Sequence, residues 1–314
     1  MRRLLATLAL LTLLSATAAC GADDDEATGT AGPLRIGYQR FGGLSLVKAR
    51  GDAPGGVTWS LFDSGPALTE ALKAGAIDLG QTGEAPPIFA AAAKTKFVVV
   101  GVGAPSPKSE AVLVKASRGF KTFADLKGRT IALNKGSNVH WLLVKLLEAN
   151  HMTLADLTVK YLKPAEGRPA FDNDQIDAWI IWDPYFALAE APGVQVLADA
   201  TGVADNREYL MVSADAAKTK TDQIKTFLSA YEKTTAWGLD HPDERAKLLA
   251  PELKIDEPII KRAEARAAQP LAPLTPAIGD ELQAIADGFT ALELIPGHVD
   301  MKSLVDPQFS VARQ

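Results

Sequence analysis

The 314-residue chain contains one cysteine, Cys20, and only four histidines. A single cysteine cannot form a disulfide within the chain. The histidines, at positions 140, 151, 241 and 298, have none of the spacings that are typical of zinc ligands. The sequence also lacks a P-loop and a Gly-x-Ser-x-Gly nucleophile motif. We therefore expect no metal, no cofactor and no catalytic residues, and we predict that the protein is not an enzyme.

An excess of positive charge is also missing. The 33 lysines and arginines are outnumbered by 38 aspartates and glutamates, and the formal net charge is -5. The basic residues are scattered along the chain, so no basic patch indicates nucleic-acid binding. If an acidic protein of this kind binds an anion, local geometry has to supply the attraction.

Long apolar runs are scarce, and the clearest one stands at the N-terminus. Arg2 and Arg3 precede the uncharged apolar stretch 4–14, which is followed by small residues. This order is typical of a secretory signal peptide. The run is too short for a membrane-spanning helix, which needs ~20 apolar residues. We assign residues 1–19 to a signal peptide.

Cys20 follows Thr17-Ala18-Ala19, a stretch that resembles a lipobox, although Thr17 stands where an aliphatic residue is usual. We favour Cys20 as a lipidation site over a plain signal peptide with a chance cysteine. Residues 20–32 are rich in Asp, Ala, Thr and Gly, which predicts a flexible tether behind the anchor. The expected location is the periplasm or the outer face of the plasma membrane, with the lipid anchor as the only membrane contact.

The remaining sequence alternates between strand and helix patterns. We predict helices at 44–50, 64–75, 83–93, 136–148 and 225–239, and strands at 34–38, 58–62, 77–80, 97–102, 111–114, 129–133, 159–162, 178–182, 194–197 and 209–213. Such alternation indicates an α/β fold with largely parallel sheets. The length suggests two lobes. We place lobe 1 at 33–115 plus 210–314 and lobe 2 at 116–209, with a ligand cleft between them.

Three predicted helices begin with small or hydroxyl residues: Ser64-Gly65-Pro66, Thr82-Gly83-Glu84 and Gly136-Ser137-Asn138. A helix N-terminus offers unpaired N–H groups and the positive end of the helix dipole to an anion. In open α/β sheets such starts line the cleft at the strand ends. Ordinary helix caps explain the same residues equally well, so spacing alone leaves both interpretations open.

Five segments stand in this order along the chain: Gly37-Tyr38-Gln39, residues 77–90, Pro107-Lys108-Ser109-Glu110-Ala111, Asn134-Lys135-Gly136-Ser137 and residues 177–185. Together they closely resemble the aliphatic sulfonate-binding proteins of ABC importers. The wider group also includes taurine-, nitrate- and thiamine-precursor-binding proteins. The resemblance extends from about residue 34 to about residue 300.

The resemblance implies a type II periplasmic-binding-protein fold whose two α/β lobes close on the ligand. It implies a monomer that delivers an alkanesulfonate to a membrane permease, with the ATPase on another chain. It also implies a ligand shell of neutral donors and one apolar wall. The donors would be Gln39, Ser64, Gly65, Thr82, Gly83, Ser137 and Asn138, and the wall would be Trp182.

Several residues keep alternative interpretations. Glu84 is unexpected beside an anion: it could orient Gln39 or backbone donors, pair with a ligand amine, or be a solvated first-turn residue. Asp183 is included in the predicted ligand shell, although a hinge or cap role is favoured for it. His140 is expected to be a surface or packing residue. Two departures from the family pattern bear on the ligand. The first helix is shortened at 50–56, which leaves the size of the accepted tail open. Arg207, near the return to lobe 1, could change the preference towards a carboxylated or aryl sulfonate.

The function that these patterns predict is that of an extracytoplasmic solute-binding protein for aliphatic sulfonates. The alternatives within the family are binding of taurine, nitrate or a thiamine precursor. An enzyme of the same fold and a structural envelope protein are less favoured. The first lacks catalytic motifs, and the second leaves the cleft-facing residues unexplained.

Overall fold

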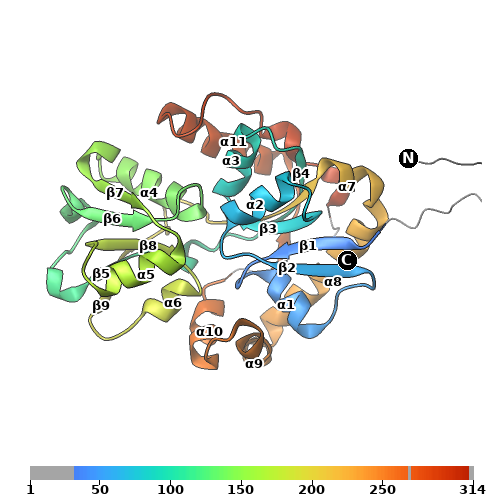
Figure 1. Cartoon of the computed structure of the whole chain (residues 1–314), viewed down its shortest axis with the longest axis horizontal. Helices are drawn as coiled ribbons and strands as arrows, with labels where there is room; N and C mark the ends of the chain where they lie inside the picture. Colours follow the sequence, from blue (N-terminus) through green and yellow to red (C-terminus); the bar gives the residue numbers. More distant parts are fainter. Residues whose placement is uncertain (1–31, 268–269, 311–314) are drawn as a thin grey trace, which may run out of the picture. The chain divides into compact units, whose positions relative to one another are not determined.

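The computed structural model describes residues 32–267 and 270–310. The predicted signal peptide, Cys20 and the tether up to residue 31 therefore lie outside the described residues. From Gly32 onward the chain forms one unit, which contains two β-sheets and the helices packed against them (Figure 1).

The first sheet has six strands. In spatial order they are β11 (Leu271–Ala272), β4 (Phe97–Gly103), β10 (Glu208–Ser213), β3 (Leu79–Gly83), β1 (Leu34–Tyr38) and β2 (Val57–Leu61). The sequence predicted all of these strands except the two-residue β11. The largest shift in position is at β3, which begins at Leu79, two residues after the predicted Ile77.

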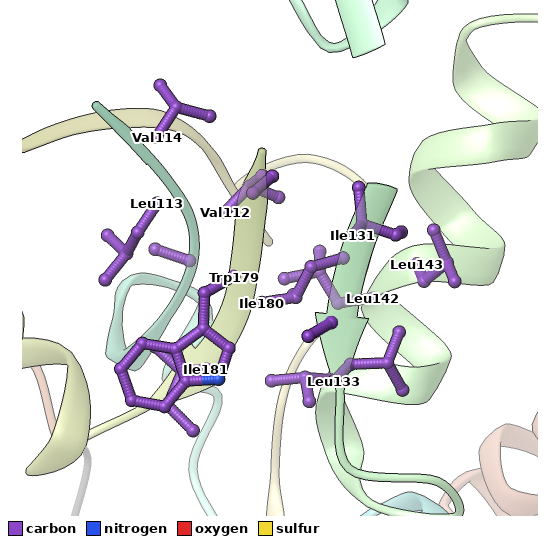
Figure 2. Close-up of a cluster of buried hydrophobic side chains, with 14 of the residues drawn as sticks. Val112, Leu113, Val114, Ile131, Leu133, Leu142, Leu143, Trp179, Ile180 and Ile181 are labelled. Carbon is purple, nitrogen blue, oxygen red and sulfur yellow. The ribbon is translucent and has the colours of Figure 1, made fainter. Parts of the chain in front are cut away.

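The second sheet has five strands. In spatial order they are β7 (Thr158–Tyr161), β6 (Thr130–Leu133), β8 (Ala178–Trp182), β5 (Glu110–Lys115) and β9 (Val194–Asp199). Side chains from β5, β6, β8 and helix α4 form its apolar core, with Leu142, Ile180 and Trp179 among them (Figure 2). The unbroken apolar sequence of β8, with all five residues buried, reflects its place in the middle of this sheet.

Helices connect and cover the strands. Their bounds are α1 (Gly43–Arg50), α2 (Gly65–Lys73), α3 (Ala85–Ala92), α4 (Asn138–Ala149), α5 (Pro164–Asp172), α6 (Tyr185–Ala189), α7 (Ala214–Thr219), α8 (Thr221–Asp240), α9 (Pro242–Leu253), α10 (Glu257–Glu264) and α11 (Pro276–Ala291). Short 3₁₀ turns include Phe123–Leu126, where Thr122 and Asp125 form a capping box. Helix α1 ends at Arg50 because Gly51 takes a left-handed conformation with φ of 72°.

The expectation of largely parallel sheets is wrong. Among the residues that the structure describes, four strand pairs are parallel and five are antiparallel. The antiparallel pairs all involve β5, β10 or β11. β5 and β10 are the strands by which the chain enters the second sheet and returns to the first, so they run against their neighbours. The sheets are therefore mixed.

The chain passes from the first sheet to the second between β4 and β5, and it returns between β9 and β10. β5 begins at Glu110 and β10 begins at Glu208, so both crossings lie close to the predicted lobe boundaries at 115 and 210. The boundaries themselves stay a prediction. The two crossing segments are joined directly, because Asn206 Nδ2 donates to Ser106 O and to Ser109 Oγ, both at 3.0 Å.

Candidate functional site

A cavity opens where loops from the two sheets meet the two crossing segments. Its empty space is about 570 Å³, including the part open to solvent. The residues that line it are Gln39, Arg40, Phe41, Asp63, Gly65, Gly83, Pro86, Ser106, Ser109, Ser137, Asn138, Trp182, Pro184, Tyr185, Asn206 and Glu208. The cavity thus takes side chains from both sheets, as the sequence predicted for a ligand cleft.

Six of the ten predicted ligand-shell residues line this cavity. They are Gln39, Gly65, Gly83, Ser137, Asn138 and Trp182. The other four, Ser64, Thr82, Glu84 and Asp183, are buried next to cavity residues but do not line it. The structure therefore brings most of the predicted set together, although its members span more than 140 positions of sequence.

Gln39 is held in place by the strand beside it. Its Nε2 donates a hydrogen bond to the backbone oxygen of Gln81 at 2.9 Å. A carboxamide nitrogen carries two N–H groups, so one remains for a ligand. Because the anchor is a backbone atom of β3, the carboxamide of Gln39 is oriented before any ligand binds.

The three helix starts differ in what they can donate. Helix α2 has Pro66 at its second position and keeps the N–H of Gly65. Helix α3 has Pro86 and Pro87 in its first turn, and proline has no N–H, so that turn loses two donors. Helix α4 has no proline at its start. The N-termini of α2 and α4 are therefore the better anion sites.

Two of the hydroxyl groups that the sequence offered as donors, those of Ser137 and Thr82, have partners within the protein. Ser137 Oγ donates to Asn134 O at 2.7 Å, and Thr82 Oγ1 donates to Gly83 O at 3.1 Å. These bonds hold the helix start and the strand end. Among the predicted donors, those that remain for a ligand are consequently the backbone N–H groups of the helix starts and the carboxamide of Gln39.

Gly83 and Asn138 are packed against each other across the floor of the cavity. A Cβ atom at Gly83 would lie 2.8 Å from Asn138 Cβ, so only glycine fits there. Asn138 Nδ2 donates to Glu110 Oε2 at 2.6 Å and to Asn206 Oδ1 at 3.1 Å. This contact places the end of β3 against the start of α4.

One wall of the cavity is aromatic. The rings of Trp182 and Tyr185 meet edge to face, with centroids 6.0 Å apart and planes at 86°. Burial raises the pKa of the Tyr185 phenol above its ordinary value, so this hydroxyl stays protonated. Phe41 adds an apolar surface from the loop after β1. Such a wall suits the carbon chain of a ligand.

Glu84 lies away from the cavity. It is 1% exposed, and its Oε2 accepts a hydrogen bond from the backbone nitrogen of Arg207 at 3.4 Å. Burial, with a smaller contribution from the charge of Glu281, raises the pKa of Glu84 to about 8. Of the roles considered for Glu84, its position fits the orientation of backbone groups rather than a solvated first-turn residue.

Asp183 also lies behind the cavity wall. Arg266 donates to both of its carboxylate oxygens, and the backbone nitrogen of Ala187 donates to Oδ1 at 3.0 Å. Burial raises the pKa of Asp183 to about 6, although Arg266 opposes this shift. The side chain is therefore fully used as a helix cap and ion-pair partner, the role that we favoured from the sequence.

His140 packs inside the protein rather than on its surface. Its ring stacks on Phe89 at 5.9 Å and also contacts Tyr161 and Phe289. Nδ1 accepts a hydrogen bond from Gly136 N at 3.2 Å. Burial, assisted by the charge of Lys135, lowers the pKa of His140 to about 4, so the ring is neutral.

Sequence reasoning missed several residues that line the cavity, among them Arg40, Tyr185, Asn206 and Glu208. Arg40 directly follows Gln39, and Tyr185 follows the Trp182-Asp183-Pro184 segment, so adjacency to the predicted shell could have found both. Asn206 takes a left-handed φ of 49°, which a local pattern does not reveal. Glu208 is the first residue of β10, and the alternation of apolar and polar residues along that strand does not distinguish it as a cavity residue.

The NMT1/THI5-like family model matches residues 63–245. The chain belongs to this family. The matched range includes the starts of α2, α3 and α4 and the aromatic wall, so the family segment contains most of the cavity.

Two relatives match this chain over most of both lengths. A protein of Escherichia coli (strain K12), named as an aliphatic sulfonates-binding protein, is 34% identical over 87% of this chain and 88% of its own length. A protein of the same name from Bacillus subtilis (strain 168) is 29% identical over 98% of this chain and 95% of its own length.

A solved structure is similar to the whole described fold. The alkanesulfonate-binding protein SsuA from Xanthomonas axonopodis pv. citri, bound to MOPS, has a TM-score of 0.83 and 33% sequence identity. The match covers 88% of this chain and 99% of that chain. The fold is therefore the type II periplasmic-binding-protein fold that the sequence predicted, with two α/β lobes and a cleft between them.

The described residues contain neither a candidate membrane span nor a candidate metal cluster. Within residues 32–267 and 270–310, no helix combines the length and apolar character that a membrane crossing requires. In the same ranges, no group of three or more histidine, aspartate or glutamate side chains could hold a metal ion.

Proposed function

We propose that this chain is the extracytoplasmic solute-binding component of an ABC importer, that it binds aliphatic sulfonates, and that it delivers them to the permease. One observation supports the proposal most strongly. Neutral donors from Gln39 and from the starts of α2 and α4 face the same cavity as the aromatic wall of Trp182 and Tyr185. The relatives named as aliphatic sulfonate-binding proteins support the same ligand class.

The chemistry of a sulfonate matches this arrangement. The group is ionised at any biological pH, and its charge is spread over three oxygens that only accept hydrogen bonds. Several neutral donors can satisfy these oxygens at once, and helix dipoles add favourable potential. Neutral donors also release an anion more readily than a buried ion pair does, which suits a protein that has to hand over its ligand.

Delivery requires the protein to close and open. We propose that residues 33–115 with 210–314 form lobe 1, that 116–209 form lobe 2, and that the two crossing segments act as the hinge. The contact of Gly83 with Asn138 and the bonds of Asn206 to Ser106 and Ser109 lie where such a hinge would turn. The protein would act as a monomer and meet the permease and its ATPase at the membrane.

The proposed location follows from the N-terminal sequence. Residues 1–19 would act as a signal peptide, and Cys20 would carry the lipid that holds the protein at the membrane, in the periplasm or on the outer face of the plasma membrane. The tether at 20–32 would leave the binding domain free to reach its permease.

Relatives that are at least 30% identical to this chain are named as binding proteins, which supports binding rather than catalysis. Taurine, nitrate and a thiamine precursor are the alternative ligands. Each of these ligands would occupy the same cavity. They differ from an alkanesulfonate in the group that would lie against the aromatic wall, and nitrate has no such group.

Calorimetric titration of residues 33–314 tests the proposal. The panel contains ethane- to octanesulfonate, MOPS, taurine, nitrate, sulfate and a pyrimidine thiamine precursor, in a phosphate buffer free of sulfonates. We expect dissociation constants in the micromolar range for alkanesulfonates, about -8 kcal/mol. Binding of nitrate or the pyrimidine alone would move the ligand to a sister family. A failure of every anion in the panel would overturn the proposed function.

A further inference from the structure

Glu208 is a carboxyl group in a cavity for which we propose an anionic ligand. It is the first residue of β10, is half-buried, and lines the cavity. An ionised carboxylate at this position would repel a sulfonate. Either a group on the ligand or the residues around Glu208 must therefore offset this repulsion.

The neighbours hold Glu208 in place without neutralising its charge. Gln81 Nε2 donates to Glu208 Oε2 and also contacts the hydroxyl of Tyr231 at 3.0 Å. Gln81 Oε1 accepts a hydrogen bond from Leu44 N at 3.0 Å, which fixes the carboxamide. A Cβ atom at Gly42 would lie 2.7 Å from Glu208 Oε2, so glycine is required beside the carboxylate. The side chain is thus built into the wall and is not a loose surface residue.

In the part of the chain that the structure describes, Glu208 lacks a positively charged partner. Among residues 32–267 and 270–310, no lysine, arginine or histidine forms an ion pair with it. Arg40 is the basic residue among those that line the cavity, and its Nη1 donates to Leu253 O at 3.1 Å. Burial, with a smaller contribution from the charge of Glu264, raises the pKa of Glu208 to about 8, as expected for a carboxylate without a counter-charge.

The charges around the cavity point the same way. The lining contains one basic side chain, Arg40, and two acidic ones, Asp63 and Glu208. Near neutral pH the raised pKa leaves Glu208 largely protonated, and a positively charged ligand group would favour its ionised form. A ligand with a positive group on its tail would match both the neutral donors and the carboxylate.

We propose that Glu208 binds the ammonium group of an aminoalkanesulfonate, so that the preferred ligand of this cavity is zwitterionic. This inference rests on the proposed function, because the sulfonate end would occupy the donors of Gln39 and of the α2 and α4 starts. A carboxylate that gains an ammonium partner in a partly dry cavity forms a charge-assisted hydrogen bond. The ligand would then supply the counter-charge that the protein lacks.

Two matched ligands test this inference. Taurine and propanesulfonate have the same chain length, and they differ in an ammonium group against a methyl group. Both are titrated by calorimetry against the wild-type protein, Glu208→Gln and Glu70→Gln. The last variant makes the same carboxyl-to-amide change on an exposed residue of α2. 3-Aminopropanesulfonate against butanesulfonate repeats the comparison with one more methylene.

We expect the wild type to prefer the amino sulfonate of at least one pair. In Glu208→Gln, the ratio of alkyl to amino dissociation constants should fall by about tenfold or more. Glu70→Gln should keep the wild-type ratio. Binding of propanesulfonate by Glu208→Gln shows that the variant is folded and its cavity is intact.

The outcomes separate this inference from the proposed function. If alkanesulfonates bind but the ratio is the same in the wild type and in Glu208→Gln, the ammonium site is overturned and sulfonate binding stands. A wild-type preference for the alkyl sulfonate in both pairs would indicate that Glu208 is a protonated donor to the anion, and it too would overturn the inference. Binding of no sulfonate overturns both.

Discussion

Arg266 donates two hydrogen bonds to the carboxylate of Asp183, from Nε to Oδ2 and from Nη2 to Oδ1, each 2.8 Å long. Asp183 directly follows Trp182, the last residue of β8. Arg266 comes just after α10, 83 positions later in the chain. Arg266 also stacks on Phe186 at 3.9 Å. This pair ties the C-terminal helices to the loop that places Trp182 and Tyr185 in the cavity.

Replacing Asp183 should therefore affect stability more than ligand contact. Asp183→Asn removes the buried one of the two carboxylates that pair with Arg266, since Glu190 also accepts from Arg266 Nη1 at 2.9 Å. We expect the free energy of unfolding to fall by about 2–3 kcal/mol. Asp172→Asn makes the same change in the exposed pair with Arg168 and should cost less than about 0.5 kcal/mol. Urea titration followed by circular dichroism measures both. Equal stability of the two variants would mean that the Asp183 pair contributes no more than a surface pair.

Gly83→Ala probes the close approach between the two lobes. The new methyl group would lie 2.8 Å from Asn138 Cβ, so β3 and the start of α4 must move apart. We expect sulfonate affinity to fall about tenfold and stability to fall by about 1–3 kcal/mol, because overpacking displaces the residues around it. Gly55→Ala is the control, since no atom lies within 4 Å of its added methyl group. Wild-type affinity of Gly83→Ala in calorimetry would contradict this account of the cavity floor.

Trp182→Ala should change how affinity depends on ligand length. Each methylene that a wall covers contributes about 0.8 kcal/mol, so the wild type should bind longer alkanesulfonates more tightly. Without the indole ring, that increment should shrink by about half or more. Trp59→Ala removes an indole that packs on Tyr38 and Phe227 outside the cavity, and it should keep the wild-type increment. An unchanged slope in Trp182→Ala would place the alkyl chain elsewhere.

His140 predicts a dependence of stability on pH. Its pKa in the folded protein is about 4, below the usual value of 6.5, so the unfolded chain binds the proton more readily between these two values. Stability that is present above pH 6.5 is lost as the pH falls towards 4. This residue should remove about 2 kcal/mol between pH 7 and pH 5.

The histidine variants isolate this contribution. His140→Asn cannot take up the proton, so its unfolding free energy should decline less than that of the wild type between pH 7 and pH 5. His151→Asn changes an exposed histidine and should follow the wild type. Urea titrations at the two pH values give the difference. Parallel curves for the wild type and His140→Asn would refute the assignment.

Cys20→Ser tests the predicted lipid anchor. The variant should appear in the soluble fraction after secretion, whereas the wild type should stay with membranes. Metabolic labelling with a fatty acid should mark only the wild type. Membrane association of Cys20→Ser, or an unlabelled wild type, would leave residues 1–19 as a plain signal peptide.

The sequence predicted most strands and the central helices because local patterns govern them. The alternation at 34–38 and the apolar run at 178–182 place β1 and β8 correctly, and Gly51 marks the end of α1. The direction of strand pairing could not be read in this way. β5 and β10 have ordinary strand sequences, and only their entry from the other lobe makes them antiparallel to their neighbours.

The residues of the candidate site also fall into two groups, those that the sequence could predict and those that it could not. Gln39, Gly65, Gly83, Ser137, Asn138 and Trp182 were predictable because they stand at strand ends, at helix starts or within family segments. Glu84 and Asp183 belong to the same segments, but their side chains turn away from the cavity to Arg207 and Arg266. A local pattern places a residue in a loop, and it does not decide to which side of the loop the side chain points.

By itself, the sequence determined the order of strands and helices, the α/β class and the segments that approach the ligand, because backbone propensity and apolar periodicity act over a few residues. Only the tertiary structure decided which side chains meet. Glu208 faces the cavity because β10 pairs with β3, which brings it to Gln81 across 127 positions. Strand pairing of this kind depends on the burial of whole sheets, and no short stretch of sequence contains that information.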